Sequence, residues 1–175
     1  EMFEQLIRAR ITALARSHDL LVGTNWAGAS LFELAQKHLE PFAHAEQISL
    51  SGPLVTLEPN AVQYLGIAFH ELATNSAKYG ALSQATGRLR IEWKLEGADD
   101  ARHLLLEWDE KFVPQLPERR QPDRKGFGTT VLERLAPEAM SGEASLERAA
   151  GSLRWVLQAP LAGVVHRGPI ELSPF

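Results

Sequence analysis

Cysteine is absent from this chain of 175 residues, which excludes disulfide bonds and zinc sites with cysteine ligands. No stretch approaches the roughly 20 consecutive apolar residues of a membrane-spanning helix, and no charged-then-apolar signal segment opens the chain. An excess of basic residues is also lacking, because the net charge is −4. We therefore expect a soluble, cytoplasmic segment that contacts neither membrane nor nucleic acid.

The composition that is present suits a folded domain. Hydrophobic residues make up 45% of the chain and charged residues 23%, which fits one globular domain or a domain with an appendage. The chain begins with Glu1 and is already in a helical pattern there. We expect it to be a fragment of a longer protein.

Three segments have helical signals. Apolar residues recur at helical spacing over residues 2–21, and this stripe can pack on its own domain or on a second copy as half of a helical hairpin. Ser30 is a candidate cap for a short helix through residue 39. Pro59 suits the first helical position of a third helix that reaches Tyr79, with Gly80 as its C-cap.

Strand-like segments come in pairs separated by turn signals, which predicts three hairpins. Long helices beside antiparallel strands predict an α+β layer sandwich. The proline-rich segment 111–125 has no periodicity and is expected to be a loop. A helix is expected to open at residues 126–130 and to run through residue 135, with an interruption at Pro137. The three expected hairpins are 47–50 with 54–57, 88–95 with 104–108, and 143–146 with 153–157.

A cluster of polar residues near the end of the third helix is the main functional signal. Glu71, Asn75 and Lys78 are spaced i, i+4 and i+7, so a carboxylate, an amide and an ammonium group share one helix face. Taken alone, such a trio is more often a solvated face than a site. Its interpretation depends on the motifs around it.

Three motifs in order carry a resemblance to a known family. The segment 70–82 resembles the N box of histidine kinases in the GHKL superfamily of ATP-binding proteins, most closely the HWE group, named for an N-box His and a Trp-x-Glu. Trp108-Asp109-Glu110 supplies the second motif, and Gly126-Phe127-Gly128-Thr129-Thr130 resembles the glycine box. The resemblance spans residues 3–161, and the three motifs together are far more specific than Gly-x-Gly alone.

The resemblance implies a two-layer α/β sandwich of the GHKL (Bergerat) ATP-binding type. It divides the chain into residues 1–24, the second helix of a dimerisation and phosphoacceptor region; residues 25–161, the catalytic ATP-binding domain; and residues 162–175, a C-terminal tail. The opening helix would then belong to a helical hairpin, which favours a homodimer.

The resemblance also assigns roles on the third helix. It implies that Asn75 ligates Mg²⁺ and that Glu71 orients or deprotonates the attacking group or holds a metal-bound water. Lys78 would meet the ATP phosphates. His70 is a candidate catalytic residue or a buried, hydrogen-bonded support for Glu71 or the lid, and Tyr79 either packs against adenine or closes the core.

The second and third motifs are expected to complete the nucleotide site. The resemblance implies that Glu110 accepts a hydrogen bond from the adenine amino group, whereas strand alternation places Trp108 in the core. The segment after Glu110, Lys111-Phe112-Val113-Pro114, lacks the glycines of the family pattern, which affects affinity or lid geometry.

The glycine box and the loop before it are expected to hold the phosphates. Unpaired amides and the positive end of the helix dipole at residues 126–128 suit an anion, and Thr129 and Thr130 would add hydroxyl contacts. The preceding loop would be a lid that folds its cations over the phosphates. Its basic residues are Arg119, Arg120, Arg124 and Lys125.

The implied reaction moves the γ-phosphoryl group of ATP to a histidine and then to an aspartate of a response regulator. A sensor domain is expected upstream. His18 matches the second helix of the dimerisation region rather than the acceptor motif, so we expect the acceptor histidine outside this chain. Two alternatives are a catalytically degenerate scaffold with the same fold and, less favoured, a GHKL serine kinase, whose phosphorylated product is stable in acid.

Overall fold

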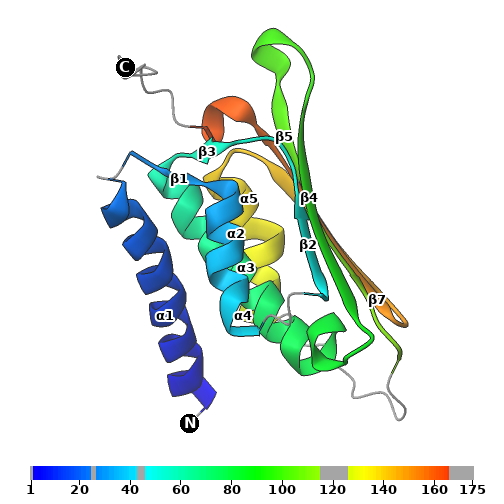
Figure 1. Cartoon of the computed structure of the whole chain (residues 1–175). Coiled ribbons are helices and arrows are strands. Elements are labelled where there is room, and N and C mark those ends of the chain that lie inside the picture. Colours follow the sequence, from blue (N-terminus) through cyan, green and yellow to red (C-terminus); the bar gives the residue numbers. More distant parts are fainter. Residues whose placement is uncertain (1, 25–26, 43–45, 115–125, 166–175) are drawn as a thin grey trace.

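The computed structural model describes residues 2–24, 27–42, 46–114 and 126–165. In Figure 1, a five-stranded sheet lies against a layer of helices, and α1 (Met2–Gly23) lies outside that layer, on the side away from the sheet. The expected two-layer α/β sandwich with an additional N-terminal helix is confirmed.

The large sheet has the strand order β2-β4-β5-β7-β6. Two of the expected hairpins are confirmed, because β4 (Arg88–Glu96) pairs antiparallel with β5 (His103–Lys111), and β6 (Glu143–Ala149) pairs antiparallel with β7 (Ser152–Pro160). β5 and β7 pair antiparallel in the centre. The sheet therefore brings the end of β5 next to the start of β4.

The expected hairpin between residues 47–50 and 54–57 is wrong. β2 (Ile48–Ser51) pairs parallel with β4, while β3 (Thr56–Leu57) pairs antiparallel with β1 (Ala29–Ser30) in a separate two-stranded sheet.

The turn between β2 and β3 explains this separation. A Cβ atom on Gly52 would collide with the indole ring of Trp93, and the Trp93 Nε1–H donates a hydrogen bond of 2.8 Å to the Pro53 carbonyl. These contacts hold the turn against the sheet, so the chain leaves β2 without folding back on it.

The predicted helix ends are confirmed. Ser30 is the N-cap of α2 (Leu31–Leu39), and its hydroxyl accepts the Glu33 amide at 3.4 Å. α3 (Pro59–Tyr79) begins with its proline at the first position, and the Gly80 amide donates to the Ser76 carbonyl. In the described ranges, we find no helix that is both long and apolar enough to cross a membrane.

The helical run after the glycine box changes its winding before Pro137. It consists of α4 (Phe127–Thr130), a π-helical turn η4 (Val131–Leu135) and α5 (Ala136–Ala139). Proline has no amide hydrogen and its ring clashes with the preceding turn, and a wider π turn relieves both problems. The expected interruption is therefore a change of helix type. The remaining short 3₁₀ turns are η1 (Glu40–Phe42), η2 (Ala81–Ser83), η3 (Asp99–Ala101) and η5 (Leu161–Gly163).

The main core lies between the helical layer and the sheet. Phe69 of α3 stacks on Trp108 of β5 with ring centroids 6.2 Å apart, and both side chains are fully buried. The expected core position of Trp108 is confirmed. Trp155 of β7 is also buried, and its indole N–H donates to the Leu132 carbonyl at 3.0 Å, which ties the π turn to the sheet.

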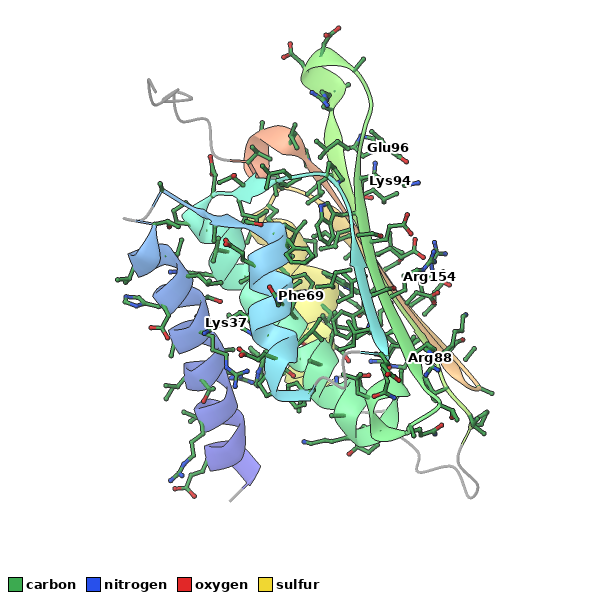
Figure 2. All side chains as sticks on the ribbon, in the orientation of Figure 1. Lys37, Phe69, Arg88, Lys94, Glu96 and Arg154 are labelled. Carbon is green, nitrogen blue, oxygen red and sulfur yellow. The ribbon has the colours of Figure 1, made fainter. Side chains whose placement is uncertain are left out.

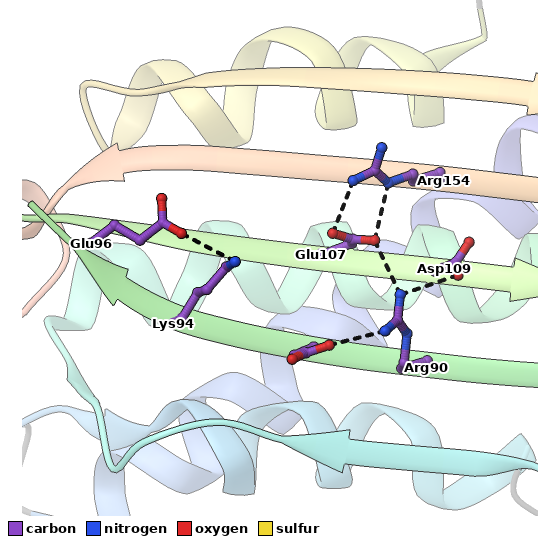
Figure 3. Close-up of polar contacts among 7 residues, drawn as sticks. Arg90, Lys94, Glu96, Glu107, Asp109 and Arg154 are labelled. Atoms are coloured by element: carbon purple, nitrogen blue, oxygen red, sulfur yellow. Dashed lines mark hydrogen bonds and ion pairs between the residues drawn. The ribbon is translucent and has the colours of Figure 1, made fainter.

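The opposite face of the sheet is charged. Lys94, Glu96 and Arg154 point away from the helices in Figure 2, and Figure 3 shows the ion pairs along this face. Arg154 donates to both carboxylate oxygens of Glu107, at 3.0 and 3.1 Å. This exposed face carries no second helical layer in the described residues.

Helix α1 is seated on α2 and α3 by a small polar contact. Ser17 and His38 are both fully buried, with Ser17 Oγ 3.2 Å from His38 Nε2. Gly66 of α3 lies directly beneath, where a Cβ atom would collide with the Ser17 hydroxyl and lie 3.0 Å from His38 Nε2. The glycine therefore permits the close approach of α1 to α3.

Candidate functional site

The glycine box approaches the polar face of α3. A Cβ atom built on Gly128 would lie 2.8 Å from Glu71 Oε2 and 3.9 Å from Asn75 Nδ2. Two of the polar residues singled out from the sequence are thus next to the second glycine of the box, although the motifs are far apart along the chain. A side chain at position 128 would displace the Glu71 carboxylate from this place.

Glu71 is a partly buried carboxylate on which the charges of two cations act. Burial raises its pKa, whereas the positive charges of Arg10 on α1 and Lys78 on α3 act in the opposite direction. A carboxyl group whose pKa is raised in this way suits proton transfer near neutral pH. The cation from α1 was not predicted.

Lys78 and Tyr79 lie at the surface where α3 ends. The Lys78 side chain is exposed, and its charge influences both Glu71 and His70. The Tyr79 side chain is 36% exposed, which contradicts the alternative that it closes the core. The contact of Lys78 with phosphate stays a prediction, and so does the contact of Tyr79 with adenine.

His70 is buried, as one alternative required, but it is not the expected hydrogen-bonded support. Its side chain is 8% exposed, and neither ring nitrogen has a hydrogen-bond partner among the residues that the structure describes. Burial lowers the pKa of His70, and the charges of Arg16 and Lys78 lower it further. The ring is therefore neutral at pH 7 and is packed rather than bonded.

Glu110 is the most buried carboxylate of the described residues, at 1% exposure. It accepts hydrogen bonds from the Ser76 hydroxyl at 2.8 Å, the Ala81 amide at 2.9 Å and the Trp108 indole at 2.7 Å. Burial raises its pKa, and these three hydrogen bonds oppose the rise. A Cβ atom on Gly80 would collide with Glu110 Oε2, so the glycine after α3 makes room for the carboxylate.

These bonds give Glu110 a structural role that the sequence did not predict. A carboxylate has about four acceptor positions, and three are filled from within the protein. Recognition of the adenine amino group by Glu110 stays a prediction, with a single acceptor position left for it. What the geometry supports directly is that Glu110 fastens the C-terminal end of α3 and the start of η2 to β5.

The segment after Glu110 is tied to its neighbours. The Phe112 amide donates to the Gly151 carbonyl at 2.9 Å. Gln84 donates to the Val113 carbonyl at 2.6 Å and accepts from the Val113 amide at 3.0 Å. The residues that replace the glycines of the family pattern are therefore held by the β6–β7 turn and by the segment after η2.

The glycine box begins a helix, as expected. Gly126 is the N-cap, and Phe127, Gly128, Thr129 and Thr130 form α4. Phe127 packs on the core, and the Arg10 guanidinium carbon lies 3.0 Å from the centroid of its ring. The expected phosphate contacts of residues 126–130 stay predictions, and the lid residues Arg119, Arg120, Arg124 and Lys125 lie outside the described residues.

The donor groups of the site decide whether Mg²⁺ could bind there. No group of three or more histidine, aspartate or glutamate side chains that could hold a metal occurs in the described part of the chain. Mg²⁺ bound with a nucleotide takes only one or two protein oxygens and otherwise phosphate oxygens and water. Asn75, with the Glu71 carboxylate one turn away, fits that requirement.

Comparisons with known proteins agree with the motifs. Residues 1–54 match the family described as HWE histidine kinase. A blue-light-activated histidine kinase of Brucella ovis is 34% identical over 170 residues, covering 96% of this chain and 34% of the relative. This chain belongs to the HWE histidine kinase family. A blue-light-activated histidine kinase of Rhizobium johnstonii is also 34% identical, over 141 residues covering 81% of this chain and 39% of that protein.

Solved structures establish the same fold. The histidine kinase domain of a blue-light-activated histidine kinase of Erythrobacter litoralis superposes with a TM-score of 0.64 at 14% identity, covering 89% of this HWE chain and 74% of that one. The histidine kinase AdeS of Acinetobacter baumannii superposes with a TM-score of 0.51 at 11% identity, covering 92% of this chain and 79% of that one. The chain spans about a third of the length of its Brucella relatives. The domain boundaries 1–24, 25–161 and 162–175 stay predictions.

Proposed function

We propose that this chain is the ATP-binding catalytic part of a two-component sensor histidine kinase. It would bind Mg²⁺-ATP and transfer the γ-phosphoryl group to a histidine, from which an aspartate of a response regulator receives it. The observation that carries this proposal is the approach of Gly128 to Glu71 and Asn75, because it joins a helix start, where an anion would be favoured, to a carboxylate and an amide.

Each polar residue of α3 has a distinct role in this proposal. The Asn75 amide oxygen would bind Mg²⁺, which neutralises phosphate charge when bound with ATP. Lys78, exposed one turn later, would contact the phosphates as a compact cation. Glu71 would accept the proton of one ring nitrogen of the acceptor imidazole, leaving the lone pair of the other nitrogen to attack the γ-phosphorus while the bond to the ADP oxygen breaks.

The test is calorimetric titration with a non-hydrolysable ATP analogue and Mg²⁺. We expect the wild-type chain to bind and Asn75→Ala to lose affinity by at least about tenfold, since one metal ligand is removed. Asn60→Ala is the matched control, because Asn60 lies at the far end of α3 and bonds the Ala139 carbonyl. A folded wild-type chain that binds no nucleotide would refute the proposal and favour the scaffold alternative.

A phosphotransfer assay separates the remaining alternatives. With a histidine-bearing acceptor helix supplied, we expect a label that acid removes, and Glu71→Gln should abolish it. An acid-stable label would identify a serine kinase instead. Mixing with candidate response regulators then tests the onward transfer to aspartate.

Helix α1 supports a proposed homodimer. Its side chains Ile7, Ile11 and Leu14 are 38%, 61% and 41% exposed, which leaves an apolar strip outside the domain core. We propose that this strip packs on a second copy and that the whole protein acts in the cytoplasm with a sensor domain upstream. Sedimentation equilibrium of the wild type and of Ile11→Glu would test the dimer.

A further inference from the structure

Arg10 connects the outer helix to the candidate site. It lies on α1, outside the helical layer, yet its guanidinium carbon is 3.0 Å from the centroid of the Phe127 ring. Phe127 is adjacent to Gly128, the residue that approaches Glu71 and Asn75. A side chain from outside the helical layer therefore reaches the glycine box.

The charge of Arg10 also acts within the site. Burial raises the pKa of Glu71. The charge of Arg10 opposes this rise more strongly than the charge of Lys78 does. The Arg10 guanidinium therefore supplies a positive charge that acts on a desolvated carboxylate. Glu71 thus lies within reach of two cations that come from two different helices.

The hydrogen bonding of Arg10 is incomplete. Its Nε atom is buried and has no hydrogen-bond partner among the described residues. The aromatic face satisfies a guanidinium electrostatically, but it provides no acceptor for the N–H group. A buried donor without an acceptor is costly, and an anion near the glycine box would supply one.

We propose that Arg10 is a nucleotide-site residue contributed by α1, which stacks on Phe127 and gives its charge to the terminal phosphates of the bound nucleotide. Rigid planar stacking presets the guanidinium for a phosphate, with little conformational entropy left to lose. By linkage, bound nucleotide would also stabilise the docking of α1, because an interaction between two groups acts in both directions. This inference rests on the proposed ATP binding.

The experiment compares Arg10→Gln with Arg8→Gln, an exposed arginine on the same helix, by calorimetric titration of the full chain. Each variant is titrated with a non-hydrolysable ATP analogue and with ADP, both with Mg²⁺. We expect Arg10→Gln to weaken binding of the ATP analogue by about tenfold and of ADP by less, with Arg8→Gln close to wild type. Arg10→Lys should lie between, since it keeps the charge but loses the planar stack.

Each other outcome overturns the inference. Equal losses for the ATP analogue and ADP would give Arg10 only a structural role, and tighter binding by Arg10→Gln would make it an obstacle to nucleotide. Behaviour identical to that of Arg8→Gln would remove Arg10 from the site while leaving the proposed function intact. If the wild-type chain and Asn60→Ala bind neither nucleotide, the proposed function fails, and this inference fails with it.

Discussion

Replacing Gly66 by alanine tests whether α1 docks on α3 as the structure shows. In an undocked helix, alanine at an interior position is more stable than glycine by about 1 kcal/mol. In the docked arrangement, the new methyl group would collide with the Ser17 hydroxyl and lie 3.0 Å from His38 Nε2. Gly66→Ala should therefore stabilise the chain if α1 is undocked and destabilise it if α1 is docked.

The magnitude follows from the buried contact. Overpacking a close-packed interface costs about 1–3 kcal/mol, and displacing Ser17 also breaks its buried hydrogen bond to His38, worth about 1 kcal/mol. After subtracting the gain in helix propensity, Gly66→Ala should lower the free energy of unfolding by about 1–3 kcal/mol. Urea unfolding followed by tryptophan fluorescence and by far-ultraviolet circular dichroism measures this difference.

Ser17→Ala supplies the internal control. It removes the hydroxyl that the new methyl group meets, so the double variant should be more stable than the sum of the single effects predicts, by about 1 kcal/mol. Stabilisation by Gly66→Ala alone, or strict additivity in the double variant, would refute the docked arrangement of α1.

Three further predictions concern buried polar groups. Burial lowers the pKa of His38 from 6.5 to about 3, so the unfolded chain binds more protons between these values. In urea unfolding, wild type should lose about 2 kcal/mol more from pH 7 to pH 5 than His38→Gln, which keeps the loss due to His70. Ser76→Ala should cost about 1–3 kcal/mol and raise the pKa of Glu110 further, as measured by carboxyl titration in NMR spectra. His70→Leu should change the free energy of unfolding by less than about 1 kcal/mol and leave nucleotide affinity nearly unchanged, because the His70 ring nitrogens make no hydrogen bond in the described structure. A tenfold loss of affinity, about 1.4 kcal/mol, would contradict this.

Much of the fold could be predicted because its signals are local. Pro59 at the start, an apolar face and Gly80 at the end predict helix α3. Alternating apolar and polar residues on both sides of a polar turn predict the hairpin of β4 and β5. The partner of β2 could not be predicted in this way. Its parallel pairing with β4 joins segments separated by the whole of α3, and no local pattern encodes that choice.

The candidate site also has features that the sequence could predict and features that it could not. Glu71 and Asn75 could be found because helical spacing and the N-box motif place them on one face. The buried bonds of Glu110 to Ser76 and Ala81 had no sequence signal, since they depend on how the end of α3 meets β5. Arg10 looked like one of several charges on an amphipathic helix, and only the packing of α1 brings it to Phe127.

The geometry of helix α3 explains why three consecutive residues have different environments. Successive side chains are about 100° apart around a helix, so Phe69, His70 and Glu71 point in three directions. Phe69 stacks on Trp108 in the core, His70 lies within the influence of Arg16 on α1, and Glu71 meets Gly128. The charges that act on His70 come from Arg16 of α1 and Lys78 of α3, whereas the Glu71 carboxylate approaches Gly128. We therefore expect His70 to contribute through packing, while in the proposed function Glu71 takes part in phosphoryl transfer.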